Sequence, residues 1–402
     1  MQKPLQLPGL TEFVILVALL SSLTALAIDG MLPALPEIGR ELGVSHDNQP
    51  QLVLSVLFLG LALGQLFIGP LSDSMGRKPL IYGGLSLFGF GCLLSMFATD
   101  FNTMLIGRFL QGLGAASPRI ITMALVRDCY RGREMARIMS LTQLIFILVP
   151  MLAPALGQGV MWLSGWRAIF TSFLLLAVGI VLWFGLRMPE TLPEDKRTKL
   201  TWSGQLLAIR SVMSHRQTIG YTVMTGFVFA AFLGYLNSSQ QILQQQYQLG
   251  PQFPLYFALL AFAIGAAGFA NAKLVLKYGM KRLVTIAIVT TIILAAGFIL
   301  IALLYQGHPP FWWFIAYVAL TFVGIGILFG NLNALAMEPL EIHAGMGASI
   351  IGSLSTFMSI PLGTMVGLWY DETVIPLVTG FLVFGLLAYL TMWLTERSEK
   401  QQ

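Results

Sequence analysis

Long apolar runs separated by short polar segments make up most of the chain. Each run is long enough to cross a bilayer as a helix, which takes about 20 residues. The pattern predicts twelve membrane-spanning helices, at about 12–38, 50–71, 79–98, 102–126, 136–160, 165–187, 216–238, 252–275, 281–304, 311–336, 345–369 and 374–394.

One long polar stretch interrupts this pattern. We expect an N-terminal six-helix bundle at 1–187, a cytoplasmic linker at 188–215 and a C-terminal six-helix bundle at 216–402. The loops at 69–78 and 273–282 correspond, because each ends with a glycine followed by two basic residues within three positions. The predicted fold class is therefore an all-α membrane protein with two pseudo-symmetric six-helix bundles.

Composition and charge agree with this class. Of the 402 residues, 56% are hydrophobic and 10% are charged, whereas soluble domains carry about 25% charged residues. Between the predicted spans, the outer side receives only Arg40 and Arg167, and the other loop Lys and Arg residues fall on the opposite side. This bias predicts a multi-pass protein of the inner membrane with both termini in the cytoplasm. The net charge of +5 reflects this topology and does not indicate nucleic acid as a partner.

Other function classes find little support. The two cysteines and four scattered histidines form no disulfide framework or metal motif. Neither a Ser/His/Asp arrangement nor a phosphate-binding loop is present, so we expect no enzyme, although a catalytic role for Asp29 is the remaining alternative. The two-half architecture disfavours a channel. An apolar run ending in Ala25-Leu26-Ala27 imitates a signal peptide, but the apolar pattern continues to about Ile38, so we expect an uncleaved first span.

Asp29 lies inside the first predicted span. A charged side chain at membrane depth costs about 2.5–3.5 kcal/mol, so a retained carboxylate indicates a functional group facing a cavity or a cation. The alternative is a structural or snorkelling carboxylate.

Arg108, Gln111 and Arg119 share one face of the fourth span. The two arginines are eleven residues apart, which places them about 20° apart around the helix and about 16 Å apart along it. We expect both to face a water-filled cavity, with Asp29 as the partner of Arg108. Alternatively, Arg119 snorkels to the cytoplasmic edge.

The segment Gly69-x-Leu71-x-Asp73-x-x-Gly76-Arg77-Lys78 resembles the signature loop of the major facilitator superfamily. The resemblance implies that Asp73 pairs with Arg127 and with the start of span 11 near Gly345. This pairing would latch the two halves closed on the cytoplasmic side. The alternative is a loop that only sets topology.

Two further segments resemble motifs of the same superfamily. Leu105-x-x-Arg108-x-x-Gln111-Gly112 resembles its span-4 motif, whose buried arginine is associated with proton-coupled transport. The segment containing Pro150, Pro154 and Gly157 resembles the exporter motif of span 5. Two prolines predict a bend there. The motif is weakened, because Ala153 and Gln158 stand where glycines are usual.

The first six spans are similar to the Bcr/CflA group of drug exporters, and the second half resembles this group mainly in topology. The similarity rests on Ile28-Asp29-x-Met31-Leu32-Pro33-Ala34-Leu35-Pro36, Val126-Arg127-Asp128 and Trp166-Arg167-x-Ile169-Phe170. Arg119 departs from the small or apolar residue expected in relatives, which argues against a purely cationic substrate.

The second half contributes aromatic and amide side chains. They suit an apolar wall for a drug-sized ligand, with packing or lipid contact as the alternative. The candidate wall residues are Phe227, Tyr235, Asn237, Asn331 and Asn333.

These observations together predict proton-coupled antiport of amphipathic organic compounds out of the cytoplasm. We expect Asp29 to carry the proton, a proton gradient in place of any cofactor, and a monomer in the lipid bilayer. One alternative is an exporter of an endogenous anion such as a siderophore or metabolite, favoured by Arg119. The other is a symport importer, favoured by the weakened span-5 motif.

Overall fold

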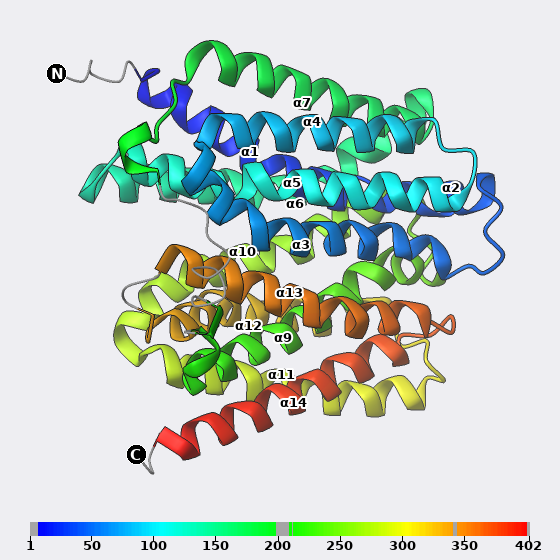
Figure 1. The fold of residues 1–402 in the computed structure, drawn as a ribbon. Coiled ribbons are helices and arrows are strands. Elements are labelled where there is room, and N and C mark those ends of the chain that lie inside the picture. Colours follow the sequence, from blue (N-terminus) through cyan, green and yellow to red (C-terminus); the bar gives the residue numbers. More distant parts are fainter. Residues whose placement is uncertain (1–6, 198–208, 211, 341–343, 400–402) are drawn as a thin grey trace. The chain divides into compact units, whose positions relative to one another are not determined.

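The computed structural model describes residues 7–197, 209–210, 212–340 and 344–399, and the regular structure of these residues is helical (Figure 1). The helices are α1 (Leu10–Asp29), η1 (Leu32–Ala34), α2 (Leu35–Glu41), η2 (Gln49–Gln51), α3 (Leu52–Met75), α4 (Arg77–Met96), α5 (Phe101–Cys129), α6 (Gly132–Ser164), α7 (Arg167–Arg187), η3 (Glu194–Lys196), α9 (Arg216–Gln240), η4 (Gln241–Gln246), η5 (Gly250–Gln252), α10 (Phe253–Tyr278), α11 (Met280–Leu304), α12 (Phe311–Met337), α13 (Ala344–Leu368) and α14 (Ile375–Glu399).

Among the described residues, twelve helical stretches are long and apolar enough to cross a membrane. The predicted all-α class and the twelve predicted spans are therefore confirmed.

The chain divides into two compact units. The first comprises Met1–Ser45 and Val56–Gln205, and the second comprises His46–Ser55 and Leu206–Gln402. Residues 198–208 and 211 of the predicted linker lie outside the described residues.

The two units repeat one packing scheme. In the first unit, α4 packs on α5 and α7, and α1 packs on α5, α6 and α7. In the second, α11 packs on α12 and α14, and α9 packs on α12, α13 and α14. Each helix pair of the first unit thus has its counterpart six spans later, as two related six-helix bundles require.

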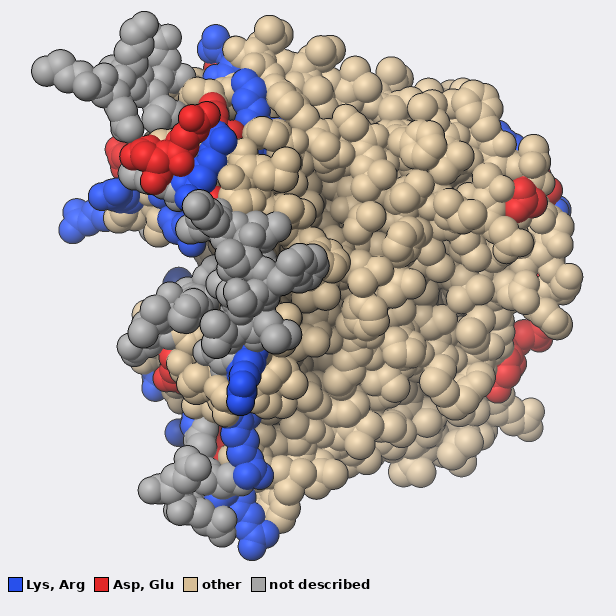
Figure 2. Space-filling view, in the orientation of Figure 1, with Lys and Arg blue, Asp and Glu red and all other residues tan. Residues whose placement is uncertain are grey.

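Charged side chains lie at the ends of the helices, and the surface between the ends consists of other residue types on the face shown in Figure 2. At one end of the first unit, the Arg187 guanidinium binds the Glu12 carboxylate through contacts of 2.6 and 2.8 Å. At the other end, Arg167 pairs with Glu41. Ion pairs at both ends, with an apolar middle, suit helices that span a bilayer.

The first span differs from the continuous helix that we expected over 12–38. Helix α1 ends at Asp29, and a turn at Gly30 and Met31 precedes η1. Pro33 accounts for the break, because proline lacks the N–H that would bond to the carbonyl of Asp29 and its ring clashes with that carbonyl. The carboxylate of Asp29 therefore sits at a helix end inside the span.

Candidate functional site

The broken end of α1 brings Arg108 and Asp29 into one buried region of the first unit. Arg108 of α5 is 0% exposed, and its Nη2 donates to the carbonyl oxygen of Ala27 at 2.8 Å. Asp29 follows two residues later and is 6% exposed. The last carbonyls of a helix lack partners within the helix, so the guanidinium satisfies one of them.

The expected ion pair between Asp29 and Arg108 is not among the ion pairs of the described residues, which corrects the prediction. The physical reason is the helix break after Asp29, which offers Arg108 a backbone acceptor that a continuous helix would have used itself. The structure also gives the Asp29 carboxylate no hydrogen bond within the described part of the chain.

Neighbouring side chains complete the surroundings of Arg108. Its Nη1 donates to Oε1 of Gln111 at 2.6 Å, and Nε2 of Gln111 donates to Ser95 of α4 at 3.4 Å. The guanidinium carbon also lies 5.9 Å from the ring centroid of Phe170 of α7, within cation–π range. The Arg108–Gln111 stripe expected from helix geometry is thus formed, and four helices contribute to its environment.

Arg119 lies in a different environment from Arg108, although both are on α5. Arg108 is buried whereas Arg119 is exposed and makes no ion pair or hydrogen bond among the described residues. The expectation that both arginines point into one cavity therefore needs correction for Arg108, which is enclosed by protein.

The N-terminus of α5 is fixed by Asp100. The Asp100 carboxylate accepts hydrogen bonds from the backbone N–H of Thr103 at 2.9 Å and from its hydroxyl at 2.7 Å. These hydrogen bonds, the hydroxyl one foremost, lower the pKa of Asp100. This N-cap anchors the helix that carries Arg108.

Gly157 of the span-5 segment packs against the chain immediately after Asp29. A Cβ atom at Gly157 would overlap the carbonyl oxygen of Gly30. Pro150 and Pro154 lie inside α6, which runs unbroken from Gly132 to Ser164. The small residue of this segment therefore allows the α1 and α6 backbones to touch beside the buried carboxylate.

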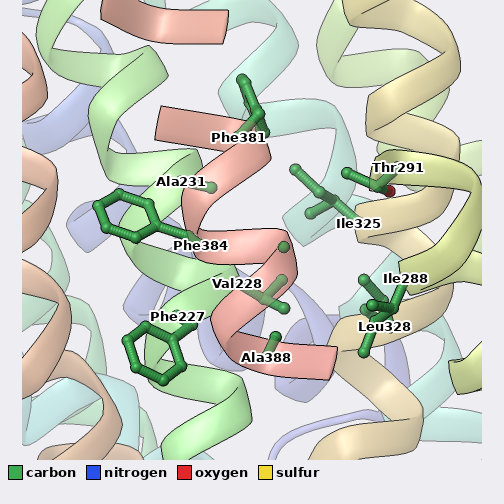
Figure 3. Close-up of a pocket in the computed structure, with 11 residues that line it drawn as sticks. Phe227, Val228, Ala231, Ile288, Thr291, Ile325, Leu328, Phe381, Phe384 and Ala388 are labelled. Atoms are coloured by element: carbon green, nitrogen blue, oxygen red, sulfur yellow. The ribbon is translucent and has the colours of Figure 1, made fainter. Parts of the chain in front are cut away.

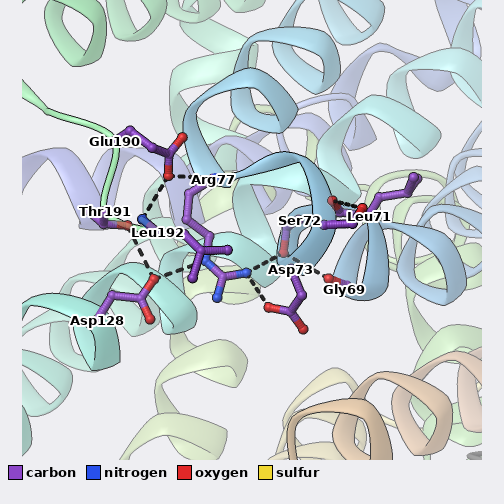
Figure 4. Close-up of polar contacts among 10 residues, drawn as sticks. Gly69, Leu71, Ser72, Asp73, Arg77, Asp128, Glu190, Thr191 and Leu192 are labelled. Carbon is purple, nitrogen blue, oxygen red and sulfur yellow. Dashed lines mark hydrogen bonds and ion pairs between the residues drawn. The ribbon is translucent and has the colours of Figure 1, made fainter. Parts of the chain in front are cut away.

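The signature loop joins α3 and α4 at one end of the first unit, and Figure 4 shows its polar contacts. Arg77 is 3% exposed. Its Nη1 donates to Asp73 at 2.6 Å and to the Ser72 hydroxyl at 2.7 Å, and its Nε donates to Asp128 at 3.0 Å. Ser72 in turn donates to the carbonyl oxygen of Gly69 at 2.9 Å.

The ion pair expected between Asp73 and Arg127 is replaced by the pair between Asp73 and Arg77. Arg77 lies four residues after Asp73, just beyond the turn at Gly76 that joins α3 to α4, and so reaches it directly, whereas Arg127 is exposed. Asp128, the next residue, supplies the carboxylate from α5, and sequence reasoning missed it. Asp128 belongs to the segment Val126-Arg127-Asp128, which carries part of the similarity to the drug exporters, and this segment could have indicated it. The contact expected near Gly345 stays a prediction.

In the second unit, aromatic rings form a connected cluster. Tyr235 is buried, and its ring centroid lies 4.8 Å from Phe322 and 6.5 Å from Phe232. Phe232 also contacts Phe329 at 5.9 Å. Phe232 and Phe329 are half-buried, so the cluster has an accessible side.

The predicted wall residues have separate partners rather than one shared surface. Asn331 exchanges two hydrogen bonds with Asn271 of α10, at 2.9 and 3.3 Å, and sequence reasoning missed Asn271. Asn237 donates to the Ser55 hydroxyl at 3.2 Å. Asn333 is exposed and donates to the carbonyl oxygen of Phe329 on its own helix at 2.9 Å.

Phe227 lines a small gap between α9, α11, α12 and α14, which Figure 3 shows. The labelled lining is apolar except for Thr291, whose hydroxyl donates to the carbonyl oxygen of Ala287 at 2.9 Å. The gap lacks a charged or amide group that could orient a ligand, so we do not assign it a substrate. Among the described residues, no cluster of three or more His, Cys, Asp or Glu side chains could hold a metal ion.

Comparison with known proteins agrees with this geometry. The Major Facilitator Superfamily pattern matches residues 17–364. The chain belongs to this superfamily, whose members are transporters and not enzymes.

Individual relatives cover nearly the whole chain. A bicyclomycin resistance protein homolog of Haemophilus influenzae is 29% identical over 403 residues, which cover 97% of this chain and 98% of that protein. The multidrug resistance protein MdtL of Vibrio parahaemolyticus is 25% identical over 332 residues, 81% of each chain. The resemblance to drug exporters of the superfamily is thereby confirmed.

The fold also matches a solved structure. The crystal structure of the human organic anion transporter MFSD10 (TETRAN) superposes with a TM-score of 0.63 at 19% identity, over 96% of this chain and 100% of that chain. This likeness concerns the fold alone.

Proposed function

We propose that this transporter exports amphipathic organic compounds across the cytoplasmic membrane in exchange for protons, by alternating access. It would work as a monomer with both termini in the cytoplasm, and the proton gradient would supply the energy without a cofactor. The names of the two relatives, which refer to bicyclomycin and multidrug resistance, support organic compounds as the substrate class.

The observation that carries the proposal is Asp29 at the broken end of α1. Its carboxylate is buried and enters no ion pair among the described residues. Moving a carboxylate between water and such surroundings changes which protonation state is favoured. A transport cycle that alternately hydrates and buries Asp29 would therefore bind and release a proton once per cycle.

Arg108 would hold in place the end of α1 that carries this carboxylate. Because its guanidinium donates to the Ala27 carbonyl and to Gln111, it would fix this helix end in either protonation state of the carboxyl. The half-buried aromatic rings of the second unit would supply apolar surface for the substrate.

Arg119 favours a second candidate, the export of an endogenous organic anion. It is exposed and has no carboxylate partner among the described residues. An unpaired guanidinium on a membrane helix attracts anions.

Everted membrane vesicles test both candidates. In vesicles energised to an acidic interior, an exported compound that exchanges for protons should dissipate the pH gradient on addition. A panel containing an ethidium-like cation, a neutral phenicol-like compound and a carboxylated compound distinguishes drug export from anion export. A gradient that no compound disturbs, in vesicles shown to contain the protein, would contradict proton antiport. Uptake that needs the opposite gradient would indicate a symport importer.

A further inference from the structure

Helix α4 begins without a capping side chain of its own. Its N-cap residue is Gly76, which has φ of +102° and provides no cap hydrogen bond. That backbone conformation favours glycine. The first N–H groups of a helix have no partner within the helix, and Ser, Thr, Asp or Asn usually supplies one. The start of α4 therefore needs an acceptor from elsewhere in the chain.

Glu190 supplies this acceptor from the segment after α7. Its Oε1 accepts from the backbone N–H of Arg77 at 2.9 Å (Figure 4). Its Oε2 accepts from the backbone N–H of Lys78 at 3.0 Å. A Cβ at Gly76 would lie 2.7 Å from Oε2, so the glycine also makes room for the carboxylate. A negative charge here complements the helix dipole.

The same segment is tied to two other helix ends. The Lys78 ammonium donates to the carbonyl oxygens of Gly185 at 2.9 Å and Met188 at 2.7 Å, at the end of α7. The Thr191 hydroxyl donates at 3.2 Å to the Asp128 carboxylate, which also accepts from Arg77. The ends of α4, α5 and α7 are thus joined through the first residues of the linker.

We propose that Glu190 is a positioning residue of the signature loop. By capping α4 from the linker, it holds the Arg77 guanidinium between Asp73 and Asp128. The linker residues Met188–Leu192 consequently belong to the loop site and move with the first unit. Without Glu190, the start of α4 loosens and Arg77 loses its fixed position.

The effect on transport rests on the proposed function, but the position of Arg77 has its own reporter. Cys129 follows Asp128 at the end of α5 and is partly exposed, whereas Cys92 is buried. The rate at which a water-soluble maleimide modifies Cys129 in the purified full-length protein therefore reports on this helix end. Glu190→Ala should raise the rate about five- to tenfold, the factor that corresponds to the loss of one helix cap.

Two further variants make this test specific. Glu194→Ala removes the same charge from the same linker, but the Glu194 side chain is 89% exposed, so its rate should equal that of the unmodified protein. Glu190→Gln keeps one carbonyl acceptor and places an amide donor against an N–H, so its rate should be intermediate. If Glu190→Ala does not fold, the modification rate of Glu190→Gln is compared with that of the unmodified protein instead. Rates unchanged in both Glu190 variants, or raised equally by Glu194→Ala, would overturn the proposal.

Transport gives the second readout. Glu190→Ala should lower the maximal efflux rate several-fold with an unchanged KM, because the residue acts through the loop and does not touch the substrate. A raised KM at an unchanged maximal rate would contradict a positioning role. If the unmodified protein transports none of the compounds, the proposed function fails while the Cys129 comparison still decides the role of Glu190.

Discussion

At the residue scale, Arg108 shows how a buried cation is accommodated in a membrane helix. Its donors reach the Ala27 carbonyl and the Gln111 side chain, both inside the first unit. These two acceptors are neutral, and Asp29, two residues beyond Ala27, enters no ion pair among the described residues. The two ionisable groups therefore lie in one unit without an ion pair between them among the described residues.

Asp29→Asn tests the proton-carrier role. Asparagine keeps the size and hydrogen-bonding capacity of aspartate but does not titrate. We expect normal expression and thermal stability, and loss of pH-gradient-driven efflux in everted vesicles. Full gradient-driven activity of the purified variant in liposomes would exclude Asp29 as the proton carrier.

Arg108→Lys should destabilise the first unit. The lysine ammonium is a compact point charge that does not reproduce the planar fork with which the guanidinium reaches its acceptors, and each buried polar group left unpaired costs about 1–3 kcal/mol. Thermal unfolding in detergent measures this loss, and Arg119→Lys, on the same helix but exposed, serves as the matched control with little change expected. Equal melting temperatures for the two variants would show that the buried contacts contribute nothing to stability.

Sequence reasoning was most reliable for side chains whose spacing alone decides their relation. The Arg108–Gln111 contact follows directly from three residues along a helix. The surroundings of Asp29 and the partner of Asp73 did not follow, because each depended on a local detail: the helix break before Pro33 and the position of Arg77 just beyond the turn at Gly76. Glu190 was missed because its partner, the start of α4, lies more than a hundred residues away.

At the scale of elements, long apolar runs predicted the twelve spans well, because length and hydropathy alone determine them. Interruptions inside a span were harder to predict. The break after Asp29 required reading Gly30 and Pro33 as a helix end despite the apolar residues around them. The π-helix η4 at Gln241–Gln246 prolongs span 7 beyond the predicted 216–238, where polar glutamines ended the hydropathy pattern but not the helix.

Gly157 provides a prediction about helix packing. Gly157→Ala places a methyl group on the Gly30 carbonyl and should force α1 and α6 apart, at a cost of about 1–3 kcal/mol for overpacking. Because the contact adjoins Asp29, gradient-driven efflux should fall as well.

Gly159→Ala is the matched control for this helix. A Cβ at Gly159 meets nothing within 4 Å, and alanine is the better helix former by about 0.8–1.0 kcal/mol. The two substitutions should therefore shift the melting temperature in opposite directions. A lower melting temperature for Gly159→Ala, or an unchanged one for Gly157→Ala, would contradict the close contact between α1 and α6.

At the scale of the whole molecule, the two units share a packing scheme but differ in buried charge. The first unit carries Asp29, Arg108 and Arg77 among its buried side chains. The buried polar residues described in the second unit are neutral, such as Asn237 and Asn331. Sequence reasoning anticipated this division, because ionisable residues within apolar runs are conspicuous. It could not predict which rings meet in the aromatic cluster, which joins residues from α9 and α12.

This uneven distribution predicts the sign of the preferred substrate. If Arg119 borders the substrate path together with the field of Arg108, Asp29 can offset only one of the two positive charges. At an effective dielectric constant of about 20, a unit charge about 6 Å from a substrate charge contributes roughly 3 kcal/mol. That energy corresponds to about two orders of magnitude in affinity.

We therefore expect neutral, zwitterionic or anionic compounds to be transported in preference to lipophilic monocations, and Arg119→Ala to relax this preference without a matching loss of stability. The measurement is the concentration dependence of efflux for a cation, a neutral compound and a carboxylate, in the unmodified protein and the variant. If Arg119 instead extends to the cytoplasmic interface, both proteins should rank the three compounds identically, because the charge then lies outside the path. An unmodified protein that prefers the cation would contradict the electrostatic argument itself, since no position of Arg119 beside the path attracts a like charge.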